Sequence, residues 1–134
     1  MLTLDDVRRL AAALPEVVEG ERRGTLTWAV GGKVFAWERY FSKADIRRFG
    51  DATPPPEPVL AVRTADLAEK AAVLAAGRPG VFTIPHFDGY AAVLVRLDDA
   101  VVGTVRDLLE DGWLSRAPAA LAADFTARAG SEPS

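Results

Sequence analysis

The segment TLTWAVGGKVFAWERYF, which spans residues 25–41, constrains the fold of this chain more than any other. Apolar and polar residues alternate before its two glycines, with Trp28 among the apolar ones, and this alternation is typical of a half-buried β-strand. Gly31 and Gly32 can supply the positive φ angles that a two-residue hairpin turn requires. The residues after them read as the returning strand. The pattern therefore predicts an antiparallel β-hairpin.

The remainder of the chain predicts further helices and short strands. Helices are expected from the capping residue Thr3 to about Leu14, from a Thr64 cap to Gly77, from an Asp98 cap to about Trp113, and from Pro118 to Phe125. Strands are expected in VLAVRT, GVFTI and AAVLVRL, and the stretch EVVEGERRG is read as a polar loop. Because short turns join neighbouring strands, the sheet should be antiparallel. We therefore expect an α+β fold, with an antiparallel five-stranded sheet and helices packed on one face.

Length and composition limit the kind of protein. A chain of 134 residues has the length of one domain, which we expect over residues 1–128, with a frayed tail over 129–134. It has no cysteine, which excludes disulfides and thiolate metal sites and is compatible with a reducing compartment. No apolar run is long enough to span a membrane, and the acidic start MLTLDD does not fit a secretion signal. We expect a cytoplasmic protein with no membrane partner and no cofactor.

Charge is distributed unevenly along the chain. The net charge is −3, yet residues 22–48 hold seven basic and two acidic side chains, so this segment carries +5 and the rest carries −8. Such asymmetry suggests that one surface meets an anionic partner. The basic residues of the segment are the candidate nucleic-acid-binding residues: Arg22, Arg23, Lys33, Arg39, Lys43, Arg47 and Arg48. The alternative is an ordinary solvated, charged surface.

The returning strand of the hairpin interleaves aromatic and basic side chains. Strict alternation places Lys33, Phe35, Trp37, Arg39 and Phe41 on one side of it. Aromatic rings beside cations can form a platform on which nucleic-acid bases stack. In the alternative, the aromatic rings fill the core beneath the helices, and the cations extend past the edge of the sheet. We favour the core interpretation, because exposed aromatic pairs are unusual on a soluble domain.

No set of residues predicts a reaction. His86 is the only histidine, and it lies in PHFDG, where Pro85 ends a strand and Asp88-Gly89 has the composition of a turn. A metal site needs three or four ligands, and a nucleophilic triad needs a positioned nucleophile. No spacing forces two carboxylates into a buried pair, and AVGGKVF lacks the GKS or GKT ending of a phosphate loop. We predict a structural role for His86, no catalytic residue and no metal site.

Four motifs in order give the chain a family resemblance. GGKVFAW, FTIPHFDGY, AVLVRL and DGWLSRAP together resemble the MmcQ/YjbR family of small bacterial proteins, over about Leu4 to Phe125. The resemblance implies an α+β fold similar to CyaY and to secretion chaperones, and a DNA-binding protein with a double-wing motif. Two positions depart from the family pattern. Ala91 stands where members often have proline, and Ala119-Ala120 replaces a frequent Lys-Arg pair, which removes positive charge.

Two functions are expected from these observations. The first is a non-enzymatic DNA-binding protein in which the seven basic residues contact phosphates largely without sequence preference. The second is a module that binds a protein partner or a small ligand and no nucleic acid. In that case the binding surface would be lined by the loop Ser42–Pro58 and the hairpin loop Pro85–Gly89.

Overall fold

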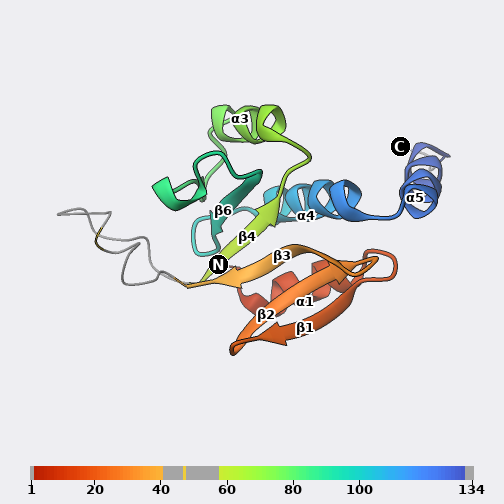
Figure 1. The fold of residues 1–134 in the computed structure, drawn as a ribbon, viewed down its shortest axis with the longest axis horizontal. Coiled ribbons are helices and arrows are strands. Elements are labelled where there is room, and N and C mark those ends of the chain that lie inside the picture. The colour runs from red at the N-terminus through yellow and green to blue at the C-terminus, as the bar shows by residue number, and fades with distance from the viewer. Residues whose placement is uncertain (1, 41–46, 48–57, 132–134) are drawn as a thin grey trace.

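The computed structural model describes residues 2–40, 47 and 58–131, which form an α+β fold around one antiparallel sheet (Figure 1). The six strands occur in the spatial order β1-β2-β3-β4-β6-β5. Their bounds are β1 Val18–Arg22, β2 Thr25–Val30, β3 Lys33–Arg39, β4 Val59–Arg63, β5 Val81–Phe82 and β6 Ala92–Arg96. The helices are α1 Leu4–Ala12, α3 Leu67–Ala75, the short 3-10 helix η1 Pro85–Phe87, α4 Val102–Arg116 and α5 Ala119–Ser131.

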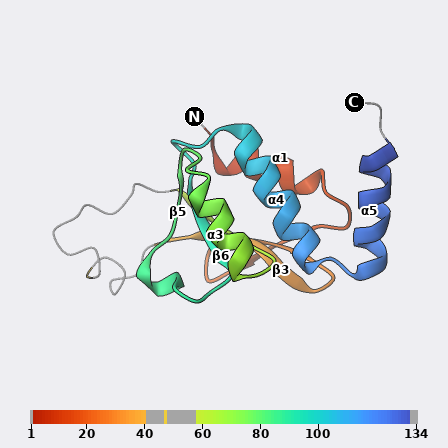
Figure 2. The ribbon, with the colours of Figure 1, turned by 90° about the horizontal axis from the view of Figure 1, so that it is seen from above.

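The main core lies between the sheet and the helices. Figure 2 shows α1 and α4 beside each other over one face of the sheet, which we call the helix-covered face, with α5 beyond the end of α4. Trp28 and Trp113 are among the largest fully buried side chains of this core. α4 comes close to the strands at Gly112, where an added Cβ would lie only 2.9 Å from Val62 Cγ1. A larger residue there would force the helix away from the sheet.

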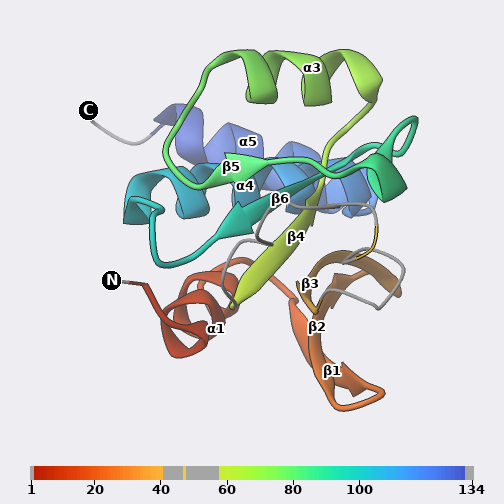
Figure 3. The ribbon, with the colours of Figure 1, turned by 90° about the vertical axis from the view of Figure 1, so that its left-hand side faces the viewer.

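A second, smaller core covers part of the opposite face, which we call the open face. The segment between β5 and β6 crosses this face, so that Ile84 and Phe87 pack on Val59, Ala61 and Leu94. Figure 3 shows this segment beside β6 and β4, with α3 at the same end of the sheet. The β1–β2–β3 part of the open face has no such cover among the described residues. The sheet therefore separates a helix-covered face from a face that is only partly covered.

The sequence pattern predicts five strands, and the additional strand of the structure is β1. Its residues, VEGER, are mostly exposed and lack an apolar alternation, so the sequence pattern predicts a loop here. It pairs with β2 at the edge of the sheet, from Val18 opposite Ala29 to Arg22 opposite Thr25. The intervening turn has positive φ at both Arg23 and Gly24, as a tight hairpin requires. Edge strands need fewer apolar residues, because one side of the ladder faces solvent.

The prediction that Phe35 and Trp37 share one side of β3 is wrong. The β2–β3 register shifts between Trp28 and Ala29, so Trp28 pairs with Ala36 while Ala29 pairs with Val34. This bulge adds a residue to β3 and interrupts the alternation of its side chains. Phe35 therefore lies in the main core, and Trp37 packs against the small core of the open face. The predicted Gly31-Gly32 turn is confirmed, with φ of 58° and 78°.

The predicted helix caps are confirmed at one position and wrong at two. Thr3 caps α1, and Asp6 completes the capping box. α3 is capped by the Asp66 side chain, which accepts a bond from Glu69 N at 2.8 Å, and Thr64 instead donates to the Asp66 carbonyl. α4 begins at Val102 without a side-chain cap, so Asp98 is not its cap.

The C-terminal helix is longer than predicted. α5 runs to Ser131, beyond its expected end at Phe125 and into the stretch that was expected to be frayed. Phe125 lies against Trp113, with ring centroids 4.9 Å apart, which ties α5 to α4. Among the described residues, no helix combines the length and the apolar character needed to cross a bilayer.

Candidate functional site

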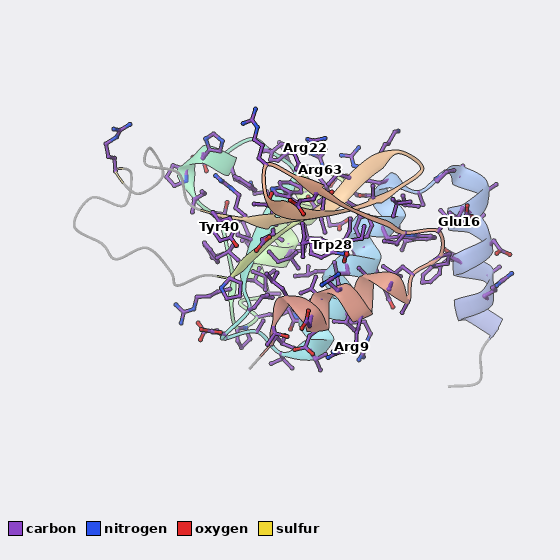
Figure 4. The ribbon with its side chains drawn as sticks, turned by 90° about the horizontal axis from the view of Figure 1, so that it is seen from below. Arg9, Glu16, Arg22, Trp28, Tyr40 and Arg63 are labelled. Atoms are coloured by element: carbon purple, nitrogen blue, oxygen red, sulfur yellow. The ribbon has the colours of Figure 1, made fainter. Side chains whose placement is uncertain are left out.

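A groove of about 840 Å³ lies over the open face at the β1–β2–β3 end of the sheet. We call it the basic groove. Its described lining comprises six basic side chains, one acidic side chain, three aromatic ones, two threonines and a valine: Arg22, Arg23, Lys33, Arg39, Arg63, Arg116, Glu38, Trp37, Tyr40, Tyr90, Thr25, Thr27 and Val34. In Figure 4, Arg22 and Arg63 lie on one side of the sheet, and Trp28 and Arg9 lie toward α1. The groove concentrates positive charge in a chain whose net charge is −3.

The structure brings together four of the seven predicted basic residues. Arg22, Arg23, Lys33 and Arg39 all line the basic groove. Arg47 is exposed but does not line it. Lys43 and Arg48, together with Phe41 and most of the Ser42–Pro58 loop, lie outside the described residues. Of the predicted basic residues, the four that belong to the β1–β2–β3 hairpins therefore lie together in one groove.

Sequence reasoning missed two basic residues of the groove, Arg63 and Arg116. Arg63 ends β4 and pairs with Ala92, on the same face as Val59 and Ala61. Alternation along VLAVR indicates that these three share a face, but it does not reveal that β4 lies beside β3. Arg116 ends α4. Its place in the groove depends on where the whole helix lies, and no local pattern encodes that.

The hairpin turn and an aromatic ring hold the groove cations in place. Arg22 ends β1 and faces Thr25 across the ladder, and Arg23 occupies the turn with φ of 53°. Arg63 places its guanidinium 4.6 Å from the centre of the Tyr90 ring, a cation–π contact. Its buried Nε has no hydrogen-bond partner within the described structure. The Arg63 guanidinium is thus positioned by its contact with the Tyr90 ring, and its Nε–H can still donate a hydrogen bond.

The single carboxylate of the groove is already engaged. Glu38 is only 6 % exposed, and its Oε1 accepts a bond from Leu26 N at 3.0 Å. Its Oε2 accepts a bond from the Tyr40 hydroxyl at 2.6 Å. Across the described residues, no carboxylate forms an ion pair with Arg22, Arg23, Lys33, Arg63 or Arg116. The charge of these five cations is therefore available to a ligand.

A second cavity of about 520 Å³ adjoins the basic groove and is lined by Trp37, Arg39, His86, Phe87 and Tyr90. We call it the aromatic cavity. Trp37 is half-buried, and its ring centre lies 6.4 Å from those of both Phe87 and Tyr90. Tyr90 is 40 % exposed and meets Phe87 edge-on. Tyr90 and Trp37 thus leave part of their rings exposed next to concentrated positive charge.

The wall of the aromatic cavity is fixed by a buried lysine. Lys70 of α3 is 7 % exposed, and its ammonium donates to the carbonyl oxygens of Phe87 and Tyr90. Burial lowers the pKa of Lys70, and the nearby Asp88 carboxylate opposes part of that shift. His86 is exposed in η1, within the predicted connection, and it lines the cavity. The described residues contain no group of three or more potential metal ligands.

Comparisons with known proteins identify relatives of unknown activity. The chain is 42 % identical over 134 residues to the uncharacterized protein Rv2570 of Mycobacterium tuberculosis strain H37Rv. The same identity is found with the uncharacterized protein Mb2600 of Mycobacterium bovis. Each alignment covers 97 % of this chain and 100 % of the relative. No protein-family profile matches the chain, and no solved structure does.

Proposed function

We propose that this chain, which belongs to one family with the uncharacterized mycobacterial proteins Rv2570 and Mb2600, binds nucleic acid through its phosphates and carries out no reaction on it. The supporting observation is the basic groove, where six cations and one engaged carboxylate line a single concave surface. Because the net charge of the chain is negative, this concentration of cations is not a consequence of composition.

The chemistry of the groove suits phosphates. Five of its six cations are arginines, whose planar guanidinium groups bind phosphate oxygens in pairs. Each phosphate that is neutralised releases condensed counterions, which favours binding and makes it weaken with added salt. Phosphate contacts carry no sequence information. We therefore propose binding with little base-sequence preference.

The absence of a reaction is also part of the proposal. Glu38 would be the acid or base of the groove, but two hydrogen-bond donors already occupy its oxygens. His86 is exposed and lines the aromatic cavity but not the basic groove, with the ring of Phe87 as its described aromatic neighbour at 6.0 Å. A general base must lie within hydrogen-bond reach of the proton that it removes. A binding role fits this arrangement better than an acid–base role.

The resemblance to the MmcQ/YjbR family also favours nucleic-acid binding, and membership of that family remains a prediction. That family is described as DNA-binding with a double wing, and this chain contributes the β1–β2–β3 ribbon to one side of the groove. Arg116 lies two residues before Pro118, close to where Ala119-Ala120 replaces the usual Lys-Arg pair. Arg116 thus supplies a cation near the position at which two are missing.

The test is a salt titration of binding, measured by fluorescence anisotropy with labelled nucleic acid. Replacing Arg22 and Arg23 with alanine should weaken binding and reduce the slope of log K against log salt by about 2, since each lost phosphate contact changes it by about 1. The matched control replaces Arg106 and Arg128, which are exposed on α4 and α5, and should leave the slope unchanged. No binding at about 50 mM salt with micromolar protein, or an equal effect of both pairs, would contradict the proposal.

A small anionic ligand is the second candidate. The volume of the groove, about 840 Å³, falls in the range of small-molecule sites, about 300–1,000 Å³. In a thermal-shift titration, inorganic phosphate or a mononucleotide would then raise the unfolding temperature at micromolar concentration, with no dependence on the length of a nucleic-acid strand. Affinity that grows with strand length would instead support the first candidate.

A further inference from the structure

We propose that the nucleic acid bound here is single-stranded, with an unpaired base in the aromatic cavity and the neighbouring phosphates in the basic groove. This inference rests on the proposed function and specifies the class of nucleic acid. It comes from the arrangement of rings and cations at the junction of the two cavities.

The two cavities adjoin each other. Trp37, Arg39 and Tyr90 line both of them, so a ligand in the basic groove lies beside the aromatic rings. Arg63 lies at the junction with its guanidinium over the Tyr90 ring. A strand would therefore meet positive charge and ring faces side by side, which is the combination used for single strands.

The rings are placed to accept the face of a base. Tyr90 is 40 % exposed, and Trp37 is half-buried beside it with ring centres 6.4 Å apart. Unpaired bases stack on aromatic rings and on guanidinium planes, whatever their sequence. Both kinds of surface are present at this junction, which agrees with binding that has little sequence preference.

A duplex would leave the aromatic cavity unused. In a duplex, each base is stacked between its neighbours and presents only its edges in the grooves. Phosphates of a duplex could contact the basic groove, but no base face could reach Trp37 or Tyr90. A single strand satisfies both cavities and is the better fit to the observed surface.

The aromatic cavity is held in shape before any ligand binds. Lys70 donates to the carbonyl oxygens of Phe87 and Tyr90, and Phe87 itself is 3 % exposed in the small core. These contacts fix the backbone that carries the Tyr90 ring. A preformed cavity reduces the ordering cost of binding.

The test compares three labelled probes of equal length by anisotropy: oligo-dT, an abasic single strand and a duplex. One stacked base contributes about 1–3 kcal/mol, so oligo-dT should bind about 5- to 150-fold more tightly than the abasic strand. Equal affinity for all three probes would overturn the single-strand inference and leave phosphate binding standing. Failure of all three to bind would remove the proposed function itself.

Variants of Tyr90 test whether a base stacks on this ring. Tyr90→Ala should lower the affinity for oligo-dT about tenfold more than the affinity for the abasic strand, which loses only the positioning of Arg63 by the ring. Tyr90→Phe keeps the ring and should retain wild-type binding to both. Equal losses on both strands in Tyr90→Ala would contradict stacking at this position.

Intrinsic fluorescence gives a measurement on the unaltered protein. Of the three tryptophans, Trp28 and Trp113 are buried, at 1 % and 0 % exposure, whereas Trp37 lies in the aromatic cavity. Oligo-dT should quench tryptophan emission and the abasic strand should not. In Trp37→Phe the quenching should disappear. Unchanged wild-type emission at saturating oligo-dT, or quenching that persists in Trp37→Phe, would overturn the inference.

Discussion

The two faces of the sheet differ in whether their basic side chains pair with carboxylates. On the helix-covered side, Arg8 and Arg78 have carboxylate partners: Arg8 forms a two-bond contact with Glu19 at 2.9 Å, and Arg78 meets Asp107 at 2.9 Å. In the basic groove, the cations converge on one concave surface, and its lone carboxylate, Glu38, is bonded to Leu26 N and the Tyr40 hydroxyl. Paired cations join elements of the fold. Cations that form no ion pair within the described residues retain their attraction for an external anion, and in the groove these are Arg22, Arg23, Lys33, Arg63 and Arg116.

The carboxyl groups outside the basic groove are of two kinds, which differ in the direction of their pKa shift. Arg8 holds the pKa of Glu19 below its ordinary value, chiefly through the hydrogen bonds between them. Along the α3–α4 seam, burial raises the pKa values of Glu69, Glu110 and Asp111, and neighbouring carboxylates add to the shift. None of these four carboxyl groups lines the basic groove. They would therefore not compete there with the polyanionic ligand that we propose.

The largest predicted effect concerns stability on the helix-covered side. Trp113 is fully buried, and its Nε1 donates to the Pro15 carbonyl at 2.9 Å. Trp113→Ala should lower the free energy of unfolding by about 3–5 kcal/mol, because it removes that bond and leaves a cavity. Urea denaturation checks this value. The folded fraction should keep wild-type affinity for nucleic acid, and a selective loss of affinity would mean that the two sides are not independent.

The second prediction concerns the lysine that links α3 to the wall of the aromatic cavity. Lys70→Met should cost about 1–3 kcal/mol of stability, since the carbonyl oxygens of Phe87 and Tyr90 lose their donor. It should also weaken binding of oligo-dT more than binding of the abasic strand. Hydrogen exchange across residues 84–91 and the two affinities provide the measurements. An unchanged ratio of the two affinities would show that Lys70 does not position the cavity.

Much of the fold was accessible from the sequence because its signals are local. The Gly31-Gly32 turn and the Thr3 capping box each depend on residues within a few positions. β1 was missed because an edge strand carries no apolar alternation. The bulge that separates Phe35 from Trp37 was missed because it arises from pairing with β2. Local patterns predict elements, and pairing between elements decides which face each side chain takes.

The candidate site could be predicted only where it is contained in one hairpin. Arg22, Arg23, Lys33 and Arg39 are close in sequence and line one groove. Arg63 ends β4 and Tyr90 lies in the connection just before β6, so the two meet because β4 pairs with β6. The aromatic cavity likewise requires the β5–β6 connection to fold over the open face. Such features need the topology of the sheet, which the sequence pattern did not specify.

A third and smaller effect tests the engaged carboxylate. Glu38→Gln should cost about 1 kcal/mol of stability, because bonds to Leu26 N and the Tyr40 hydroxyl would no longer involve a charged acceptor. The same change removes the negative charge from the groove, so nucleic acid should bind several-fold more tightly at low salt. Anisotropy at two salt concentrations measures this gain. Weaker binding by a fully folded variant would contradict a purely electrostatic role for Glu38.

The smallest predicted effect concerns pH and the acidic seam. A carboxyl group whose pKa is raised by folding binds its proton more tightly in the folded state, so its ionisation disfavours that state. For Glu69 and Glu110, with ordinary values of 4.5, and Asp111, with 3.8, stability should therefore fall as the pH rises through and above these values. Groups with lowered pKa values, such as Glu19, lose their stabilisation as the pH falls.

Asp111→Asn isolates this contribution, because Asp111 raises the pKa values of both Glu69 and Glu110. The variant should be more stable than the wild type at pH 7, and the advantage should shrink as the pH falls through about 4 and be nearly gone at about pH 3, where aspartate is mostly protonated in both states. Urea denaturation from pH 3 to pH 8 measures the difference. Affinity for nucleic acid should stay the same, since the seam does not line the groove. If the variant were still more stable than the wild type at pH 3, its advantage would come from packing. Charge repulsion between the carboxylates would then be excluded as the cause.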